Sequence, residues 1–293
     1  MDKNRLLALL PLLLLAVSLP ARAEERLNVV ASFPVVADIA RQVGGDHVTV
    51  TSLVPPETDP HAWHPQPRDM RRLAGADLVV VNGLGLEGWL DRAIAASGYG
   101  GPVVVASRDV APILDASGTP DPHAWHSLAN ARLYAEAIAQ ALAEAAPQHT
   151  ASFRDNQAAF ERKLAVLQEM MDNVLPLIAP EHRVVVATHD AFAYLARDYG
   201  MRVLAPQGPD SASQPSARRI AGLIGEMHAA AVKAVFVENG TDPRLALMIS
   251  EEAGVAIGGE LYAGTLSRPG GPAADYAAMW EHNVFLMLHA MER

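Results

Sequence analysis

Short apolar runs alternate with longer segments whose apolar residues recur at helical spacing. The runs in the first half of the chain are rich in valine, which favours strands. We expect these strands at residues 27–31, 48–54, 77–81 and 102–106. The intervening helical patterns cover residues 34–43, 68–73 and 86–96. Continuous apolar strands that alternate with helices are typical of a parallel sheet covered on both faces.

The second half of the chain repeats this alternation. We expect its strands at residues 183–188, 201–205, 233–238 and 255–259. We expect its helices at residues 191–199, 215–231, 243–253 and 273–291. Gly200 and Gly254 follow two of these helices directly, where glycine commonly ends a helix in the left-handed conformation.

One long segment between the halves, residues 151–178, contains no glycine and has its only proline at Pro176. Its apolar residues keep helical spacing, so we predict a helix of about 28 residues and roughly 40 Å. Such a length favours a link between two lobes. The predicted fold is therefore α/β, with two lobes, each a four-stranded mainly parallel sheet flanked by helices, joined by one long linking helix. The predicted boundaries are 24–147 for the N-terminal lobe, 148–179 for the linking helix and 180–293 for the C-terminal lobe.

The first 23 residues differ from everything that follows. Charged residues precede an apolar run at 6–19, and an Ala-x-Ala site ends at Ala23, which is typical of a signal peptide, here residues 1–23. The chain has no cysteine to form a disulfide or to carry a lipid. We therefore expect a soluble periplasmic protein without a lipid anchor. The formal net charge of −10 argues against binding to nucleic acid.

The hexapeptide Asp-Pro-His-Ala-Trp-His occurs twice, at residues 59–64 and 121–126. With a further histidine at His189, the repeat suggests a site assembled from distant imidazoles, which are common zinc ligands. The alternative is that Asp-Pro begins a helix, tryptophan fills a core and the histidines are incidental. In the second copy, Asp121 would cap a helix that runs to about residue 145, with His123 in its first turn. Pro65 and Pro67 prevent this continuation in the first copy, so the copies should occupy different settings.

Several motifs together resemble the periplasmic substrate-binding proteins of zinc and manganese ABC transporters. These motifs are Asp-Pro-His at 59–61, Asp-Pro-His-Ala-Trp at 121–125, Thr-His-Asp-Ala-Phe-Ala-Tyr-Leu at 188–195, Ala-Pro-Gln-Gly at 205–208 and Phe-Val-Glu-Asn at 236–239. The resemblance implies a metal ion between the lobes, bound by His61, His123 and His189. Manganese binders of this family carry glutamate at the third position, so three imidazoles favour zinc. His64 and His126 do not match ligand positions, and we expect both to be partly exposed.

The fourth ligand position departs from the family pattern. An aspartate is usual there, but this chain has Gly264, which leaves water, Glu260 or no group to complete the site. The connection at 109–119 is also short, whereas many zinc-binding members have a histidine- and acid-rich loop at that place.

The leading hypothesis is capture of zinc as a transported ligand and its delivery to a membrane ABC permease. A periplasmic metallochaperone is a second candidate partner, and we expect a monomer that is not an enzyme. A zinc-dependent hydrolase is the alternative, because three histidines with an open water position also describe a hydrolytic site. The chain has no His-Glu-x-x-His helix or Gly-x-Ser-x-Gly elbow to support it. Binding of a metal chelate would fit two lobes but leave the histidines unexplained.

Overall fold

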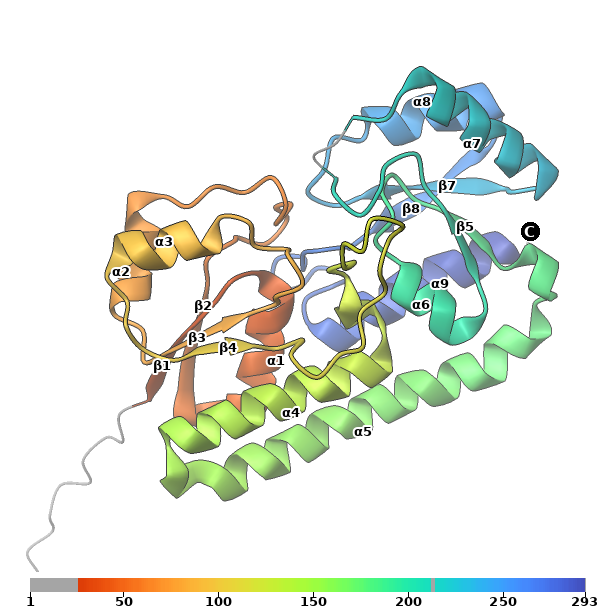
Figure 1. Cartoon of the computed structure of the whole chain (residues 1–293). Coiled ribbons are helices and arrows are strands. Elements are labelled where there is room, and N and C mark those ends of the chain that lie inside the picture. Colours follow the sequence, from red (N-terminus) through yellow and green to blue (C-terminus); the bar gives the residue numbers. More distant parts are fainter. Residues whose placement is uncertain (1–25, 212–213, 293) are drawn as a thin grey trace, which may run out of the picture.

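The computed structural model describes residues 26–211 and 214–292, and Figure 1 shows them as two α/β lobes above a pair of long helices. The predicted signal peptide, residues 1–23, lies outside the described residues. Within the described ranges, no helix combines the length and the apolar character that a bilayer-spanning segment needs.

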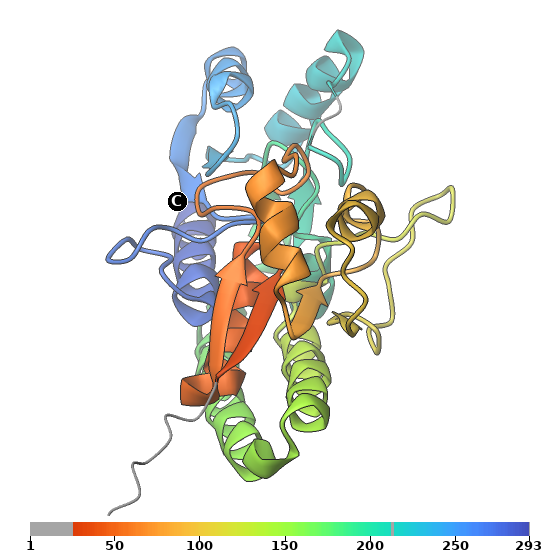
Figure 2. The ribbon, with the colours of Figure 1, turned by 90° about the vertical axis from the view of Figure 1, so that its left-hand side faces the viewer.

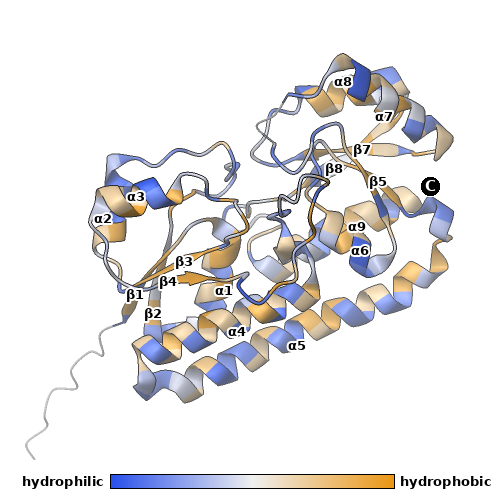
Figure 3. Cartoon of the chain, in the orientation of Figure 1, coloured by the Kyte–Doolittle hydropathy of each residue, from blue (hydrophilic) through white to orange (hydrophobic). Residues whose placement is uncertain are grey.

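The N-terminal lobe contains one four-stranded parallel sheet in the order β2-β1-β3-β4. Its strands are β1 (Leu27–Ala31), β2 (Val48–Ser52), β3 (Leu78–Val81) and β4 (Val103–Val105). Its helices are α1 (Pro34–Gly44), α2 (Pro67–Ala74) and α3 (Leu90–Ser97). β3 is buried at all four positions and entirely apolar, as Figure 3 shows. The strands predicted for this half are confirmed.

The C-terminal half also has its four predicted strands, but their ladders form two parallel pairs instead of one continuous sheet. The pairs are β5 (Val184–Val186) with β6 (Arg202–Leu204), and β7 (Ala234–Glu238) with β8 (Ala256–Leu261). β5 lies beside β7. The backbone N–H groups of two residues that follow β5 nevertheless donate to a side chain at the end of β7 and not to its backbone. Thr188 N and His189 N donate to Glu238 Oε1 at 2.8 and 3.0 Å. The α/β class with two lobes is confirmed, and the single C-terminal sheet is corrected.

Two long helices run side by side, α4 (Leu128–Ala145) and α5 (Thr150–Val174), as Figures 1 and 2 show. α4 lies beneath the N-terminal lobe, and α5 extends beneath both lobes. The predicted helix at 151–178 is thus confirmed over most of its length. It ends earlier because Pro176 has no N–H, and a 3-10 turn (Leu175–Leu177) follows. Further 3-10 turns are Gly45–His47, Ala124–His126, Pro147–His149 and Pro180–His182.

The remaining helices divide between two hydrophobic cores. α6 (Ala193–Tyr199) and α9 (Tyr276–Met291) join the larger core of the N-terminal sheet, α1, α4 and α5. α7 (Ala217–Ala229) and α8 (Arg244–Ala253) form a smaller core with β5, β6 and β7. Gly200 and Gly254 end α6 and α8 in the left-handed conformation, with φ of 60° and 66°, as predicted. Two helices from the second half of the chain, α6 and α9, therefore pack into the core of the N-terminal lobe.

Candidate metal centre

Three histidine side chains meet between the lobes. His61 lies in the loop after β2, His123 precedes the 3-10 turn before α4, and His189 follows β5. The Nε2 atom of His123 lies 3.1 Å from Nε2 of His61 and 3.3 Å from Nε2 of His189. One ring nitrogen from each histidine lies within 4.8 Å of the other two. The structure thus brings together the three histidines that the sequence singles out.

These separations suit a small cation. Imidazole nitrogens bind zinc at about 2.0–2.1 Å, so two of them at tetrahedral positions lie roughly 3.3–3.4 Å apart. The observed 3.1 and 3.3 Å are close to this spacing. His123 and His189 are buried and His61 is half-buried, which limits competition from bulk water. Three ring nitrogens that converge in a buried place can act together as ligands of one ion.

His123 is oriented by a carboxylate two residues before it. Asp121 Oδ1 accepts hydrogen bonds from His123 N at 2.9 Å and from Nδ1 at 2.8 Å. The Nδ1 atom therefore carries the proton, and the lone pair of Nε2 faces the other histidines. Burial, followed by the nearby His189 and His61, holds the pKa of His123 well below its usual range. A neutral imidazole is the form that binds a metal ion.

The predicted role of Asp121 as a helix cap is wrong. Its carboxylate is taken by His123, and the α-helix begins only at Leu128. Ser127 is the cap, with its Oγ accepting from Asn130 N at 3.2 Å. His123 accordingly lies before the 3-10 turn and not in the first turn of a helix.

His189 has a carboxylate partner, Glu238, which belongs to the motif at 236–239 but was given no role from the sequence. Its Nδ1 contacts Glu238 Oε2, and Glu238 Oε1 also accepts from Thr188 Oγ1 at 2.6 Å. Burial alone raises the pKa of Glu238, but His189 and the donors of Thr188 and His189 outweigh it and hold this pKa at about 2. Burial lowers the pKa of His189, and the charge of Glu238 reverses that effect and raises it. The ionised Glu238 thus fixes the ring with Nε2 toward the centre.

The backbone of His61 is held by Asp59, two residues before it. Asp59 Oδ1 accepts from His61 N at 2.9 Å, and Asp59 Oδ2 accepts from Ser211 Oγ at 2.6 Å. The second contact joins the first histidine loop to the C-terminal half. Burial lowers the pKa of His61 more than the charge of Asp59 raises it.

The remaining histidines of the two hexapeptides lie outside the cluster. His64 is exposed, as expected. The expectation of partial exposure is wrong for His126, whose relative exposure is 1 %. Its Nε2 lies 2.9 Å from the carbonyl oxygen of Ala263, and the ring of Phe192 packs at 4.5 Å between centroids. Burial, and then the neighbouring His123, lowers the pKa of His126 to about 3. A neutral, hydrogen-bonded ring is therefore part of the packing behind the site.

A cavity of about 10 Å³ adjoins the histidines at the position of Gly264. A Cβ atom on Gly264 would lie 2.8 and 3.0 Å from ring carbons of Pro60, so any side chain there would require the first histidine loop to shift. Glu260, considered from the sequence as a substitute ligand, is exposed on β8 and does not line this cavity. The geometry therefore gives no support to Glu260 as the group that completes the site.

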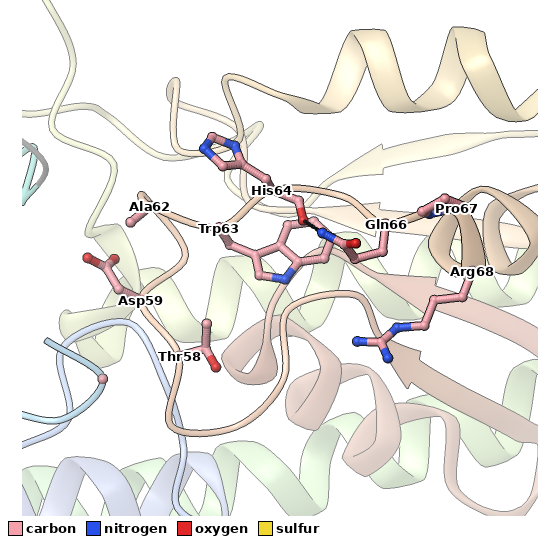
Figure 4. A pocket seen from close by; sticks show the side chains of 9 residues that line it. Thr58, Asp59, Ala62, Trp63, His64, Gln66, Pro67 and Arg68 are labelled. Carbon is pink, nitrogen blue, oxygen red and sulfur yellow. Dashed lines mark hydrogen bonds between the residues drawn. The ribbon is translucent and has the colours of Figure 1, made fainter.

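A wider pocket of about 680 Å³ opens beside the first histidine loop (Figure 4). It is lined by Thr58, Asp59, Ala62, Trp63, His64, Gln66, Pro67, Arg68 and Gly240. Asp59 lines both this pocket and the small cavity. Figure 4 shows the His64 side chain well apart from Asp59, at another part of the loop. The first histidine loop thus contributes Asp59 to the walls of both cavities.

The chain matches a family model described as the periplasmic zinc-uptake complex component A, over residues 29–289. It is 31% identical to the iron-binding protein YfeA of Yersinia pestis over 268 residues, which is 90% of this chain and 86% of the relative. It is 32% identical to the manganese-binding lipoprotein MntA of Bacillus subtilis over 279 residues, with coverage of 92% and 91%.

A solved structure with the same architecture is the periplasmic zinc-binding protein TroA of Treponema pallidum. The TM-score is 0.87 at 26% identity, and the match covers 92% of this chain and 100% of the other. These similar proteins carry names that refer to three different metals, iron, manganese and zinc.

Proposed function

Because this chain belongs to the family of periplasmic zinc-uptake components, we propose that it captures zinc between its lobes and delivers it to a membrane ABC permease. The family consists of metal-binding transport proteins and not of enzymes, so the hydrolase alternative is set aside. The observation that carries the proposal is the convergence of three Nε2 atoms, 3.1 and 3.3 Å apart, from both halves of the chain. We assign His61, His123 and His189 as the ligands.

The choice of zinc rests on ligand chemistry. Imidazole suits zinc and its neighbours, whereas manganese prefers carboxylate, carbonyl and water oxygens. The carboxylates that contact two of these rings, Asp121 with His123 and Glu238 with His189, serve to orient them. A site of three imidazole ligands therefore favours zinc over manganese, although one of the similar proteins is named for manganese.

Capture couples the two halves of the chain. His61 and His123 come from the N-terminal lobe and His189 from the C-terminal half, so a bound ion holds them together. An ion that binds only the folded state stabilises it in proportion to the logarithm of free metal over Kd. The predicted linking helix at 148–179 would restrict the lobes to modest relative movement. We propose that the monomer is the functional form, with the permease, and a metallochaperone where one exists, as its partners.

Localisation belongs to the same proposal. The family is described as periplasmic, and the expected signal peptide at 1–23 agrees with export. Several similar proteins are named lipoproteins, among them MntA of Bacillus subtilis, so a lipid anchor occurs among the relatives of this chain. A soluble form without a lipid stays a prediction for this chain.

Competition titration against a chromogenic chelator tests the choice of metal. The purified metal-free protein should bind one zinc ion per chain, with manganese(II) and iron(II) at least about a hundredfold weaker. Tighter binding of manganese or iron, or two zinc ions of equal affinity, would contradict the proposal. Delivery is tested by zinc uptake into vesicles that contain the cognate permease, with His189→Ala as the variant that should deliver none.

A further inference from the structure

Asn239 lies directly after Glu238 at the end of β7 and lines the small cavity beside the histidines. Its backbone N donates to the carbonyl oxygen of Leu261 at 2.8 Å, which fixes the residue at this edge. Its side-chain Oδ1 is buried and has no hydrogen-bond partner among the residues that the structure describes. An amide oxygen is an acceptor with two lone pairs, so its isolation in a buried place needs an explanation.

The other side-chain oxygens around this cavity already have partners. Both oxygens of Asp59 accept hydrogen bonds, from His61 N and from Ser211 Oγ. Glu238 is engaged through both oxygens by the segment that contains His189. The hydroxyls are also engaged, since Thr241 Oγ1 donates to the Glu238 carbonyl and Thr265 Oγ1 accepts from Glu57 N.

Asn239 Oδ1 is thus the one side-chain oxygen of this lining, among described residues, that is left to meet a donor or a cation. The space next to it is about 10 Å³, close to the minimum that holds one water molecule. A zinc ion with three protein ligands takes a water molecule in its fourth position. A bound water polarised by the ion is a strong donor, and a buried neutral acceptor is a suitable partner for it.

We propose that Asn239 Oδ1 accepts a hydrogen bond from the water molecule that completes the coordination of the bound metal ion. The inference rests on the proposed function, because it requires an ion at the three histidines. Asn239 is then a positioning residue for the bound ion, acting through water. The neutral amide leaves the charge of the site unchanged, and Gly264, which lines the same cavity, leaves room for the ring of Pro60.

The variant Asn239→Leu tests this assignment, because it keeps a similar volume and removes the acceptor. Zinc affinity, measured by chelator competition, should fall about three- to tenfold, which matches the loss of one hydrogen bond. The metal-free variant should unfold at the same temperature as the original protein or higher, because it no longer buries an unpartnered oxygen. Asn239→Ala should change the zinc affinity in the same direction, and it guards against a packing artefact of leucine.

Asn173→Leu is the matched control, since Asn173 lies on the exposed face of α5. It should leave zinc affinity unchanged. X-ray absorption at the zinc edge of the loaded original protein should reveal one oxygen ligand beside three imidazole nitrogens. Unchanged affinity in both Asn239 variants, or a zinc ion without that oxygen ligand, overturns the proposal. If the original protein binds no metal at all, the proposed function itself fails, which is a different result.

Discussion

The two copies of Asp-Pro-His-Ala-Trp-His share six residues but little of their surroundings. In both, the aspartate Oδ1 accepts from the backbone N of the first histidine at 2.9 Å. Beyond that contact they diverge. Asp121 also binds the ring of His123, whereas Asp59 binds Ser211 across the lobes. The local turn is therefore encoded by the hexapeptide, and the role of its carboxylate is decided by tertiary contacts.

The second half of each hexapeptide differs more. Trp125 is fully buried and donates to Ala263 O at 2.9 Å, while Trp63 is half-buried against Trp89 at 4.7 Å between ring centroids. His126 is buried and His64 is exposed. The first copy forms a loop on the solvent side of the centre, and the second forms the packed wall behind it. In the proposed site, the first copy would therefore place His61 on an accessible loop, and the second would place His123 in a packed wall.

The largest expected effect concerns the two proposed ligands in the repeat, His61 and His123. His123→Ala should lower zinc affinity by on the order of a thousandfold, more than the tenfold to hundredfold typical of losing a partner that orients a ligand. His61→Ala should cost less, because its half-buried position lets water replace the lost nitrogen. Chelator competition measures both. An equal loss in the two variants would remove the distinction between a fixed and an accessible ligand.

The last histidines of the two hexapeptides, His64 and His126, should differ in their effect on the stability of the fold and not on the affinity for zinc. His126→Ala removes a buried ring and its contact with the Ala263 carbonyl, and should lower the free energy of unfolding by about 2–4 kcal/mol. His64→Ala should change it by less than about 0.5 kcal/mol, as is usual for exposed positions. Urea unfolding of the metal-free proteins checks this. A costly His64→Ala would show that the first loop is packed as tightly as the second copy.

The same contrast predicts a pH dependence. The pKa of His126 is about 3 in the folded state and near 6.5 when unfolded, so the unfolded chain binds an extra proton between these values. The stability that His126 contributes is therefore fully present above about pH 6.5 and is lost as the pH falls toward 3. Relative to His126→Gln, the metal-free protein should lose roughly 2–3 kcal/mol more between pH 6.5 and 4.5.

Parallel unfolding curves for the metal-free protein and His126→Gln over that range would contradict a neutral buried ring. His64→Gln is the control for this experiment and should follow the unmodified protein at each pH, because its ring is exposed in the folded state.

Substitution of the two aspartates should change zinc affinity by smaller factors than substitution of the histidines, and the two factors should differ. Asp121→Asn removes the charge that holds the His123 proton on Nδ1, and should lower zinc affinity about tenfold. Asp59→Asn keeps an acceptor for His61 N and should lower affinity less than threefold. Isothermal titration of both variants against a zinc buffer measures the difference. If Asp59→Asn is the more damaging change, the carboxylate of the first copy has a direct role toward the ion.

The smallest effect concerns the contact of Gly264 with the first copy. Gly264→Ala places a methyl group against the ring of Pro60, and should lower the free energy of unfolding by about 1 kcal/mol. It should weaken zinc binding slightly, because Pro60 precedes His61. Thermal unfolding with and without zinc checks both. Unchanged or tighter binding would show that the loop adjusts to a side chain at this position.

The elements of the fold were predictable because each depends mainly on local pattern. The valine-rich run at 27–31 and the glycine-free segment at 151–178 show their burial in the periodicity of a few neighbouring residues. The three histidines were predictable from the resemblance of the motifs around them. In these cases the informative residues lie close together along the chain.

The features that sequence did not predict depend on distant partners. Asp121 before Pro122 has the pattern of a helix cap, and only the fold shows that His123 takes its carboxylate. Glu238 becomes a partner of His189 because β5 and β7 end side by side, which no local pattern reveals. The burial of His126 follows from Phe192 and Ala263, which lie far along the chain.

The central claim is that one zinc ion is bound by His61, His123 and His189 together. X-ray absorption at the zinc edge of the singly loaded protein tests it most directly, because multiple scattering from imidazole rings counts the histidine ligands. The account predicts three imidazole nitrogens and one oxygen at about 2.0–2.1 Å. In His189→Ala the count should fall to two. Two or fewer imidazoles in the unmodified protein, or a count that His189→Ala leaves unchanged, would contradict the claim.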